Sequence, residues 1–379
     1  MRIAYVTTYN SSDIHSWSGS GYYILRTLQT CGFQTKTIGN LRDNYIFISK
    51  MKNALYSKIL SKAYLRDREP ALLKNYATQV ESALVRIGCD VVFSPGTLPI
   101  AYLRTDKPIV FWTDATFAGM IDFYPNFSNL CTETIKNGNK MEQLALSKCH
   151  LAIYNSEWAA KPAIQKYNVD SAKVKVVPFG ANIDCNRNLQ DINIIIDNKN
   201  FDTCKLLFLG VDWFRKGGDM ALKIADLLTQ RGIRTELHLV GCNPPVSPPH
   251  FVRQHGFISK TTEEGRRFLG KLMAESHFLI LPSRAECCAV VFAEASSFAL
   301  PSLATNVGGI STAIHSGNNG QTFPLDASPE KYCDYIERFM SSKQEYRELA
   351  LSSFAEYTER LNWLSAGRKV RDLIQQFCS

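Results

Sequence analysis

Two glutamates, Glu286 and Glu294, have seven residues between them in a segment whose pattern favours ligand binding. In Leu281–Ile310 an apolar strand is expected to run into a loop with Glu286 and then into a short helix with Glu294. An ionised carboxylate only accepts hydrogen bonds, so it can take both hydroxyls of a diol. Unpaired backbone N–H groups at the start of that helix would bind an anion such as a diphosphate. These amides belong to Cys288, Ala289 and Val290.

Each glutamate also has a plain structural interpretation. Glu286 could simply complement the helix dipole, which is worth up to about 1 kcal/mol, and Glu294 could face solvent on its helix. The sequence around Glu294, AVVFAEASSFAL, is otherwise apolar. A charged side chain in such a helix should be paired or bound to a ligand. This setting favours a paired or ligand-bound role for Glu294.

A second group that could do chemistry is the cationic pair Arg215 and Lys216, in the segment LLFLGVDWFRKGGDMA. The segment reads as a strand, a glycine-containing turn and a helix start, which would place both cations at the mouth of a sheet. These cations suit a reaction in which a diphosphate is the leaving group. Negative charge grows on the diphosphate as its bond breaks, and two cations beside a helix N-terminus can neutralise it. The chain lacks the D-x-D motif that metal-dependent enzymes commonly use for this purpose, so we expect neither metal nor cofactor. The alternative is a pair of solvated turn residues.

The elements that would position these residues alternate between strand and helix. Short apolar runs rich in β-branched residues are separated by helical segments, a pattern typical of parallel sheets covered by helices on both faces. In the first half the runs are Arg2–Thr7, Asp90–Ser94, Ile109–Thr113, Leu151–Tyr154 and Lys173–Val177. In the second half they are Lys205–Leu209, Glu236–Val240, Phe278–Leu281 and Pro301–Thr305.

Residues 184–203 break this alternation and favour a linker with surface character. A length of 379 residues also exceeds the size of most single hydrophobic cores. We therefore expect an α/β chain with two Rossmann-like domains, residues 1–183 and 204–365, that face each other across a cleft. Ligands bind such sheets at the carboxyl ends of their strands.

The segment around the two glutamates resembles family 4 of the glycosyltransferases, which have the GT-B fold. The shared pattern is Pro-Ser-x-x-Glu, seven residues, Glu-Ala, then Leu-Pro and Gly-Gly. In that family the first glutamate, here Glu286, binds hydroxyls of the donor sugar, and the second, Glu294, binds the ribose hydroxyls of the nucleotide. The glycine that usually follows the first glutamate is replaced by Ala289. The resemblance spans nearly the full chain and is strongest at Lys216 and over residues 286–309.

The resemblance implies roles for further residues. Lys216 matches a lysine that contacts the diphosphate, and Arg215 stands next to it although many members place the arginine several residues earlier. The glycine-rich loop after the first strand would close over the diphosphate and touch the acceptor, with Gly19 as the closest residue. Asp114, at the end of another strand, either acts on the acceptor hydroxyl and the anomeric carbon or caps a helix. The nucleobase would meet a loop that contains Phe257 and Ile258.

The implied reaction is transfer with retention of the anomeric configuration, in which the departing phosphate can itself take the acceptor proton. The donor would be a UDP- or GDP-hexose bound by residues 204–365. The acceptor would be a hydroxyl of a glycan, a lipid-linked molecule or a small molecule, bound by residues 1–183. Residues 366–379 would form a helix that packs back on the N-terminal domain. The rival interpretations are a sugar-nucleotide epimerase of the same architecture and a non-catalytic partner subunit.

Composition narrows the classes of partner. The net charge of +8 suits an acidic partner, but the chain has no zinc-finger spacing and no RNP-like motif, which disfavours nucleic acid. The N-terminal residues lack a signal-peptide core, and no apolar run reaches the length of a membrane span, so a cytoplasmic protein is expected. The eleven cysteines include no C-x-x-C pair, which favours buried thiols over a metal or redox site.

Residues 50–74 favour a basic amphipathic helix. Met51, Leu55, Ile59 and Ala63 form one i,i+4 row, and the next row is formed by Lys58, Lys62 and Arg66. Such a face could lie on anionic lipid headgroups, which would suit a lipid-linked acceptor. The alternative is an ordinary surface helix whose apolar row packs on the core.

Overall fold

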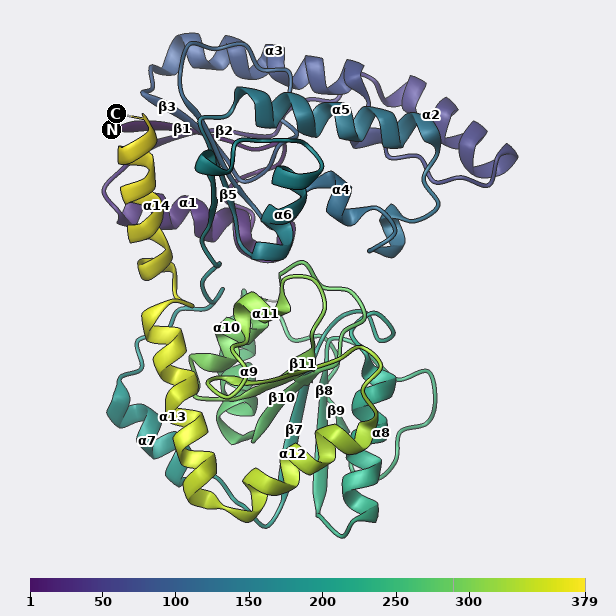
Figure 1. Ribbon diagram of the computed structural model, residues 1–379, viewed down its shortest axis with the longest axis vertical. Helices are drawn as coiled ribbons and strands as arrows, with labels where there is room; N and C mark the ends of the chain where they lie inside the picture. The colour runs from purple at the N-terminus through teal and green to yellow at the C-terminus, as the bar shows by residue number, and fades with distance from the viewer. Residues whose placement is uncertain (289, 379) are drawn as a thin grey trace. The chain divides into compact units, whose positions relative to one another are not determined.

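The computed structural model describes residues 1–288 and 290–378 and divides into two compact units. Unit 1 consists of Met1–Pro178 together with Ala366–Ser379, and unit 2 is Phe179–Ser365. Each unit contains a six-stranded sheet with helices packed beside it (Figure 1). The α/β class with two Rossmann-like domains, predicted from the alternation of strands and helices, is confirmed.

The sheet of unit 1 is parallel throughout, and its central strands are buried because helices cover them. Every residue of the run IVFWT at positions 109–113, for example, is buried. In spatial order the strands are β2 (Gln34–Ile38), β1 (Arg2–Val6), β3 (Val91–Ser94), β4 (Ile109–Thr113), β5 (Leu151–Tyr154) and β6 (Val174–Val176). The order reverses between β1 and β3, which makes the loops after these strands the expected place for a ligand.

The helices of unit 1 include one that comes from the end of the chain. From Ala366 onward α14 (Trp363–Cys378) belongs to unit 1 and packs beside α1 (Ser20–Thr30), as Figure 1 shows. The packing is close, because a Cβ on Gly367 would lie 2.5 Å from Thr27 Cγ2. The remaining helices are α2 (Ile46–Ala54), α3 (Pro70–Ile87), α4 (Phe117–Met120), α5 (Thr132–Lys148) and α6 (Glu157–Gln165), with single turns η1 (Ser16–Gly19), η2 (Leu55–Ile59), η3 (Arg66–Arg68), η4 (Pro125–Phe127) and η5 (Ser171–Lys173).

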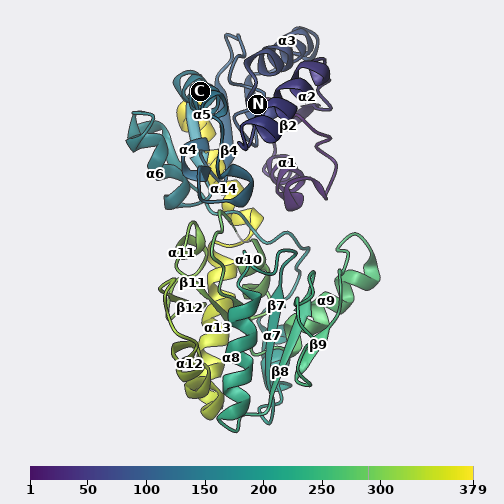
Figure 2. The ribbon, with the colours of Figure 1, turned by 90° about the vertical axis from the view of Figure 1, so that its right-hand side faces the viewer.

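The sheet of unit 2 is also parallel, and Figure 2 shows β7, β8 and β9 side by side in it. In spatial order the strands are β12 (Gly320–Phe323), β11 (Ser302–Thr305), β10 (Phe278–Leu281), β7 (Cys204–Leu209), β8 (Thr235–Val240) and β9 (Val252–Gln254). This is the doubly wound order of dinucleotide-binding sheets, with its reversal between β7 and β10. The loops that follow β7 and β10 therefore meet at the switch point of unit 2.

The helices of unit 2 pack around one large apolar core. Helix α8 (Gly218–Gln230) lies beside α12 (Pro329–Ser341), and α13 (Lys343–Glu359) packs against both α7 (Leu189–Asp197) and α10 (Val290–Ser296). The unit is completed by α9 (Glu263–Glu275) and α11 (Ile310–Ala313).

The segment 184–203, which the sequence favours as a linker, instead contains helix α7 of unit 2. The Asn188 side chain caps this helix, and Asp191 bonds back to the backbone N–H of Asn188. Ile192 and Ile196 then enter the core of unit 2. The polar residues around them hide this pattern in the sequence. The compact units divide at Pro178, five residues before the expected end of the first domain.

Within the described residues, no helix combines the length and the apolar character needed to cross a bilayer. Cys149, Cys204 and Cys333 are buried free thiols, which is the state that the absence of a C-x-x-C pair favours.

Candidate functional site

The two loops at the switch point of unit 2 carry Arg215, Lys216 and Glu286. The loop after β7 supplies the two cations, and the loop after β10 supplies the carboxylate. Lys216 Nζ donates to Glu286 Oε2, and Arg215 Nη1 lies 3.3 Å from the same oxygen. Glu286 is only 5% exposed, so its charge is balanced mainly by these two cations. The structure thus brings Arg215 and Lys216 together with Glu286, which lies 71 and 70 positions further along the chain.

Close packing of the two loops fixes the position of Lys216. Gly217 has a φ of 76°, and a Cβ at this position would lie 2.0 Å from Pro282 O. Only glycine allows this approach of the two backbones. Arg284 holds the loops together further, because its backbone N–H donates to Arg215 O at 2.8 Å and its guanidinium forms an ion pair with Asp219.

Glu294 lies on α10 and is completely buried. Both of its carboxylate oxygens accept hydrogen bonds from Lys260 Nζ, at 2.5 and 2.6 Å. Lys260 belongs to the loop between β9 and α9 and was not expected from the sequence, although it follows Phe257 and Ile258 closely. The apolar setting of Glu294 was the signal for such a partner, since a buried carboxylate requires a counter-charge or a ligand. Glu294 is thus paired with a cation, which is one of the two possibilities that its apolar setting predicts.

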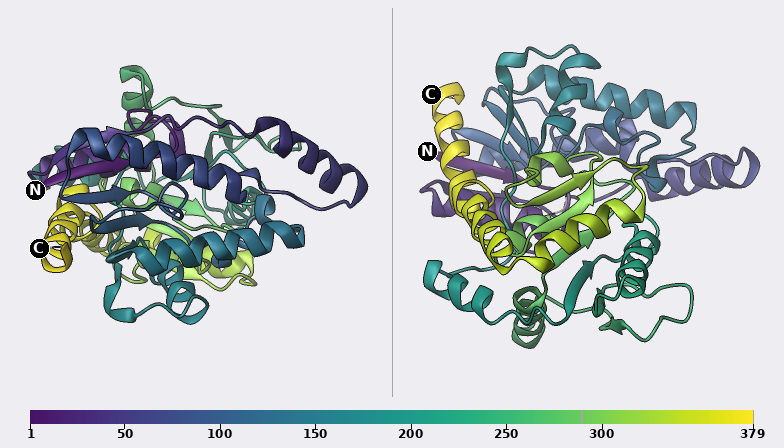
Figure 3. Two further views of the ribbon diagram at one scale, coloured as in Figure 1. Left: turned by 90° about the horizontal axis from the view of Figure 1, so that it is seen from above. Right: turned by 60° about the horizontal axis from the view of Figure 1, so that its bottom comes forward.

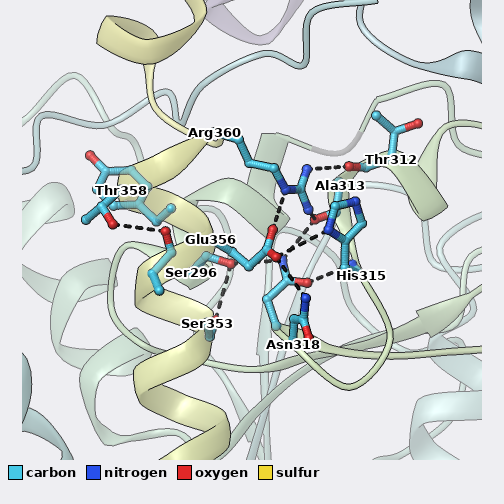
Figure 4. Close-up of polar contacts among 12 residues, drawn as sticks. Ser296, Thr312, Ala313, His315, Asn318, Ser353, Glu356, Thr358 and Arg360 are labelled. Carbon is cyan, nitrogen blue, oxygen red and sulfur yellow. Dashed lines mark hydrogen bonds and ion pairs between the residues drawn. The ribbon is translucent and has the colours of Figure 1, made fainter.

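A polar network behind α10 and α11 supports the site (Figure 4). Arg360 of unit 2 donates to Glu356 and to the last carbonyls of α11, and Ser353 on α13 donates to Ser296 on α10. Burial opposes ionisation of Glu356, but Arg360 and Asn318 hold the pKa of this carboxyl below its ordinary value. The loop between β11 and α11 is fixed in turn to the site, because Gly309 N–H donates to Glu286 O at 3.1 Å.

The remaining residues predicted in unit 2 lie around these pairs. Cys288 and Val290, whose amides were expected to bind an anion, are half-buried at the start of α10, and Ala289 lies outside the described residues. Phe257 is 71% exposed, whereas Ile258 packs against the core. The loop that carries them is tied to β8, because Gly241 N–H donates to Gly256 O at 2.8 Å.

In unit 1, Asp114 and the glycine-rich loop meet at the carboxyl ends of β1 and β4. Trp17 Nε1 donates to Asp114 Oδ2 at 3.0 Å. Trp17, Ser18 and Gly19 all have positive φ, which is costly for the first two and marks a backbone held by its surroundings. Asp114 does not cap the following helix, because Thr116 is the N-cap of α4.

Tyr9 is a further polar group at this place, and no motif in the sequence singles it out. Its hydroxyl is buried and has no hydrogen-bond partner within the described part of the chain. Burial and the charges of Asp114 and Asp13 raise the pKa of Tyr9 to about 12. A neutral hydroxyl that can donate and accept is therefore available beside Asp114.

Residues 1–288 and 290–378 contain no group of three or more His, Cys, Asp or Glu side chains arranged to hold a metal ion. The positive charge at the unit 2 switch point comes from side chains, since Arg215 and Lys216 both contact Glu286.

The family model "Glycosyl transferases group 1" matches residues 203–342, which include Lys216, Glu286 and Glu294. The D-inositol 3-phosphate glycosyltransferase of Gordonia bronchialis is 25% identical over 240 residues, which cover 59% of this chain and 51% of that protein. The glycogen synthase of Pseudomonas putida is 25% identical over 171 residues, which cover 43% and 32%. The chain thus spans about half the length, or less, of these curated relatives.

Solved structures resemble the chain over nearly its whole length. Sucrose-phosphate synthase from Thermosynechococcus elongatus matches with a TM-score of 0.69 and 14% identity, covering 99% of this chain and 98% of that one. Anabaena HepE, solved in complex with UDP-glucose, matches with a TM-score of 0.63 and 14% identity, covering 99% of this chain and 100% of that one. At these identities the likeness shows the fold.

Proposed function

We infer that this chain, which has the GT-B fold, is a group 1 glycosyltransferase that transfers a hexose from a nucleotide-diphosphate sugar to a hydroxyl acceptor with retention of configuration. The observation that carries the proposal is the contact of Lys216 and Arg215 with Glu286 at the switch point of unit 2. Two cations and a nearly buried carboxylate at one point can hold a diphosphate and the hydroxyls of the sugar attached to it.

Glu286 and Glu294 divide the recognition of the donor between them in this proposal. Glu286 accepts hydrogen bonds from hydroxyls of the hexose, and Glu294 accepts them from the ribose. Lys260 balances the buried charge of Glu294 in the absence of donor. Both carboxylates are held in place by packing, so little ordering remains to be done when the donor binds.

Lys216 and Arg215 act on the leaving group. Cleavage of the bond between the anomeric carbon and the phosphate oxygen transfers negative charge to the diphosphate, and two fixed cations lower the energy of that state. The acceptor hydroxyl attacks from the face that the diphosphate leaves, and the departing phosphate oxygen takes its proton. Because side chains supply the positive charge, we propose that transfer requires no metal ion, and activity should persist in EDTA.

The partners proposed are a UDP- or GDP-hexose and an acceptor that is a glycan, a lipid-linked molecule or a small molecule. HepE was solved with UDP-glucose, which makes a UDP-hexose the first donor to test. We assign the acceptor to unit 1, where Asp114 and the Tyr9 hydroxyl can orient its hydroxyl group. Buried free thiols such as Cys149 and Cys204 favour a reducing, cytoplasmic setting.

The test is product analysis with UDP-, GDP- and ADP-hexoses, after a thermal-shift panel has selected the donors that stabilise the chain. Transferred sugar supports the proposal, whereas an epimerised nucleotide sugar or no product at all would replace it with one of the two rivals. In the active enzyme, Lys216→Ala should lower kcat by about 100- to 1,000-fold. Lys223→Ala, an exposed lysine on α8, is the matched control and should leave kcat unchanged.

A further inference from the structure

Helix α2 and the turn η2 turn their apolar side to solvent. Phe47 is 76% exposed and Ile59 is 72% exposed, and between them Met51 and Leu55 are exposed as well. These four residues are spaced four apart and form one row, which Ile46 and Leu60 extend. We call these six side chains the outer row.

The described side chains that α2 and η2 turn toward the rest of unit 1 are polar. Lys52 Nζ donates to Glu69 at 2.8 Å and to Glu133 at 2.6 Å, and Tyr56 OH donates to Glu133 at 2.9 Å. Ser49 is buried on the same side. The polarity is thus the reverse of that of an ordinary surface helix, which buries its apolar stripe.

This arrangement decides between the two interpretations of residues 50–74 that the sequence left open. The apolar row of Met51, Leu55 and Ile59 does not pack on the core. The single basic helix expected over these residues is also divided, because the chain leaves the helix after Ile59 and Arg66 lies in η3, paired with Asp43. Both views in Figure 3 show α2 and η2 extending outward from unit 1.

The charged side chains of the segment that carries the outer row are all positive. Residues 44–65 contain four lysines and no acidic residue. Lys52 is used in the inward ion pairs, whereas Lys50, Lys58 and Lys62 are exposed. An apolar row with lysines beside it matches the boundary of a membrane, where apolar side chains enter the acyl region and lysines meet anionic headgroups.

We propose that the outer row of α2 and η2 binds the surface of a membrane that contains anionic lipids. A contiguous apolar surface of this kind marks an interaction site. A second copy of the chain fits less well, because a symmetric contact through the same surface would bring the lysines of two copies together. Membrane binding requires no donor sugar, so it is tested separately from the transfer reaction.

The test is co-sedimentation of the full chain with phosphatidylcholine vesicles that contain or lack phosphatidylglycerol. Wild-type chain should bind the anionic vesicles. Phe47→Ser combined with Ile59→Ser should lower the partition coefficient about 100-fold, since each buried apolar side chain is worth about tenfold. Lys50→Gln combined with Lys58→Gln should lower it about 30-fold and weaken its dependence on salt.

The matched control is Val85→Ser combined with Ile194→Ser, which removes two exposed apolar side chains elsewhere and should leave binding unchanged. The four residues replaced by serine are all exposed, so both variants should fold normally. Their melting temperatures check this. Equal binding by wild type and the Phe47/Ile59 variant would overturn the proposal, as would equal binding to both kinds of vesicle. A lipid-free dimer that dissociates in the Phe47/Ile59 variant would identify a second copy as the partner instead.

Discussion

The ion pair between Lys260 and Glu294 should contribute strongly to the stability of unit 2. Glu294 is completely buried, and both of its oxygens are bonded to Lys260 Nζ. Lys260→Met keeps most of the side-chain volume but leaves the carboxylate without its cation. Removing one partner of a buried pair costs about 3 to 5 kcal/mol, and the lower figure applies here because the Lys260 side chain is 38% exposed.

A loss of about 3 kcal/mol corresponds to a fall of about 6 to 12 °C in melting temperature for a unit of this size. Differential scanning calorimetry of the full chain measures it, and Lys271→Met is the matched control. Lys271 pairs with Glu275 at 3.8 Å on the surface, with 66% of its side chain exposed, and should contribute no more than about 0.5 kcal/mol. Adding Glu294→Gln to Lys260→Met should recover most of the loss, because the uncompensated charge is then gone. Equal melting temperatures for the Lys260 and Lys271 variants would refute the reasoning.

Two further predictions concern the fold around the sites. Burial raises the pKa of Glu142 from 4.5 to about 7, so folded unit 1 keeps a proton that the unfolded chain releases. The contribution of Glu142 to the stability of unit 1 is therefore largest below pH 4.5 and should fall by roughly 3 kcal/mol as the pH rises to 7; Glu142→Gln should remove this contribution from melting curves recorded across that range, and an unchanged pH dependence would contradict the assignment. Gly217→Ala should destabilise unit 2 by at least about 2 kcal/mol more than Gly232→Ala and should also reduce transfer. Both glycines have positive φ, but only a Cβ at Gly217 meets another residue, Pro282 O; equal effects would argue against close packing of the two loops.

The sequence was sufficient for the fold class, and it singled out Arg215, Lys216 and Glu286, which the structure brings into contact in unit 2. Buried strands such as β10 are continuous apolar runs, so nine of the twelve described strands could be predicted. The other three, β2, β9 and β12, are partly exposed and lack such a run. Glu286 and Lys216 follow two of these strands, and the doubly wound order brings such loops together. The family 4 resemblance inferred from these residues is confirmed by the group 1 family model over residues 203–342.

The parts that the sequence did not reveal depend on contacts between distant residues. Lys260 lies in a loop without a periodic pattern, and its contact with Glu294 arises from the way α9 and α10 pack. Helix α7 lies in a segment whose sequence favours a linker, because polar residues surround Ile192 and Ile196. For α2 the periodicity identified an amphipathic segment, but which side faces unit 1 is decided by the ion pairs of Lys52 with Glu69 and Glu133.

A crystal structure of the chain with a bound nucleoside diphosphate would test the central claim most directly. The diphosphate should lie within hydrogen-bond distance of Lys216 Nζ, and the ribose hydroxyls should donate to the carboxylate of Glu294. A nucleotide bound elsewhere on the chain, with the Lys216–Glu286 and Lys260–Glu294 pairs unchanged, would contradict the proposed donor site.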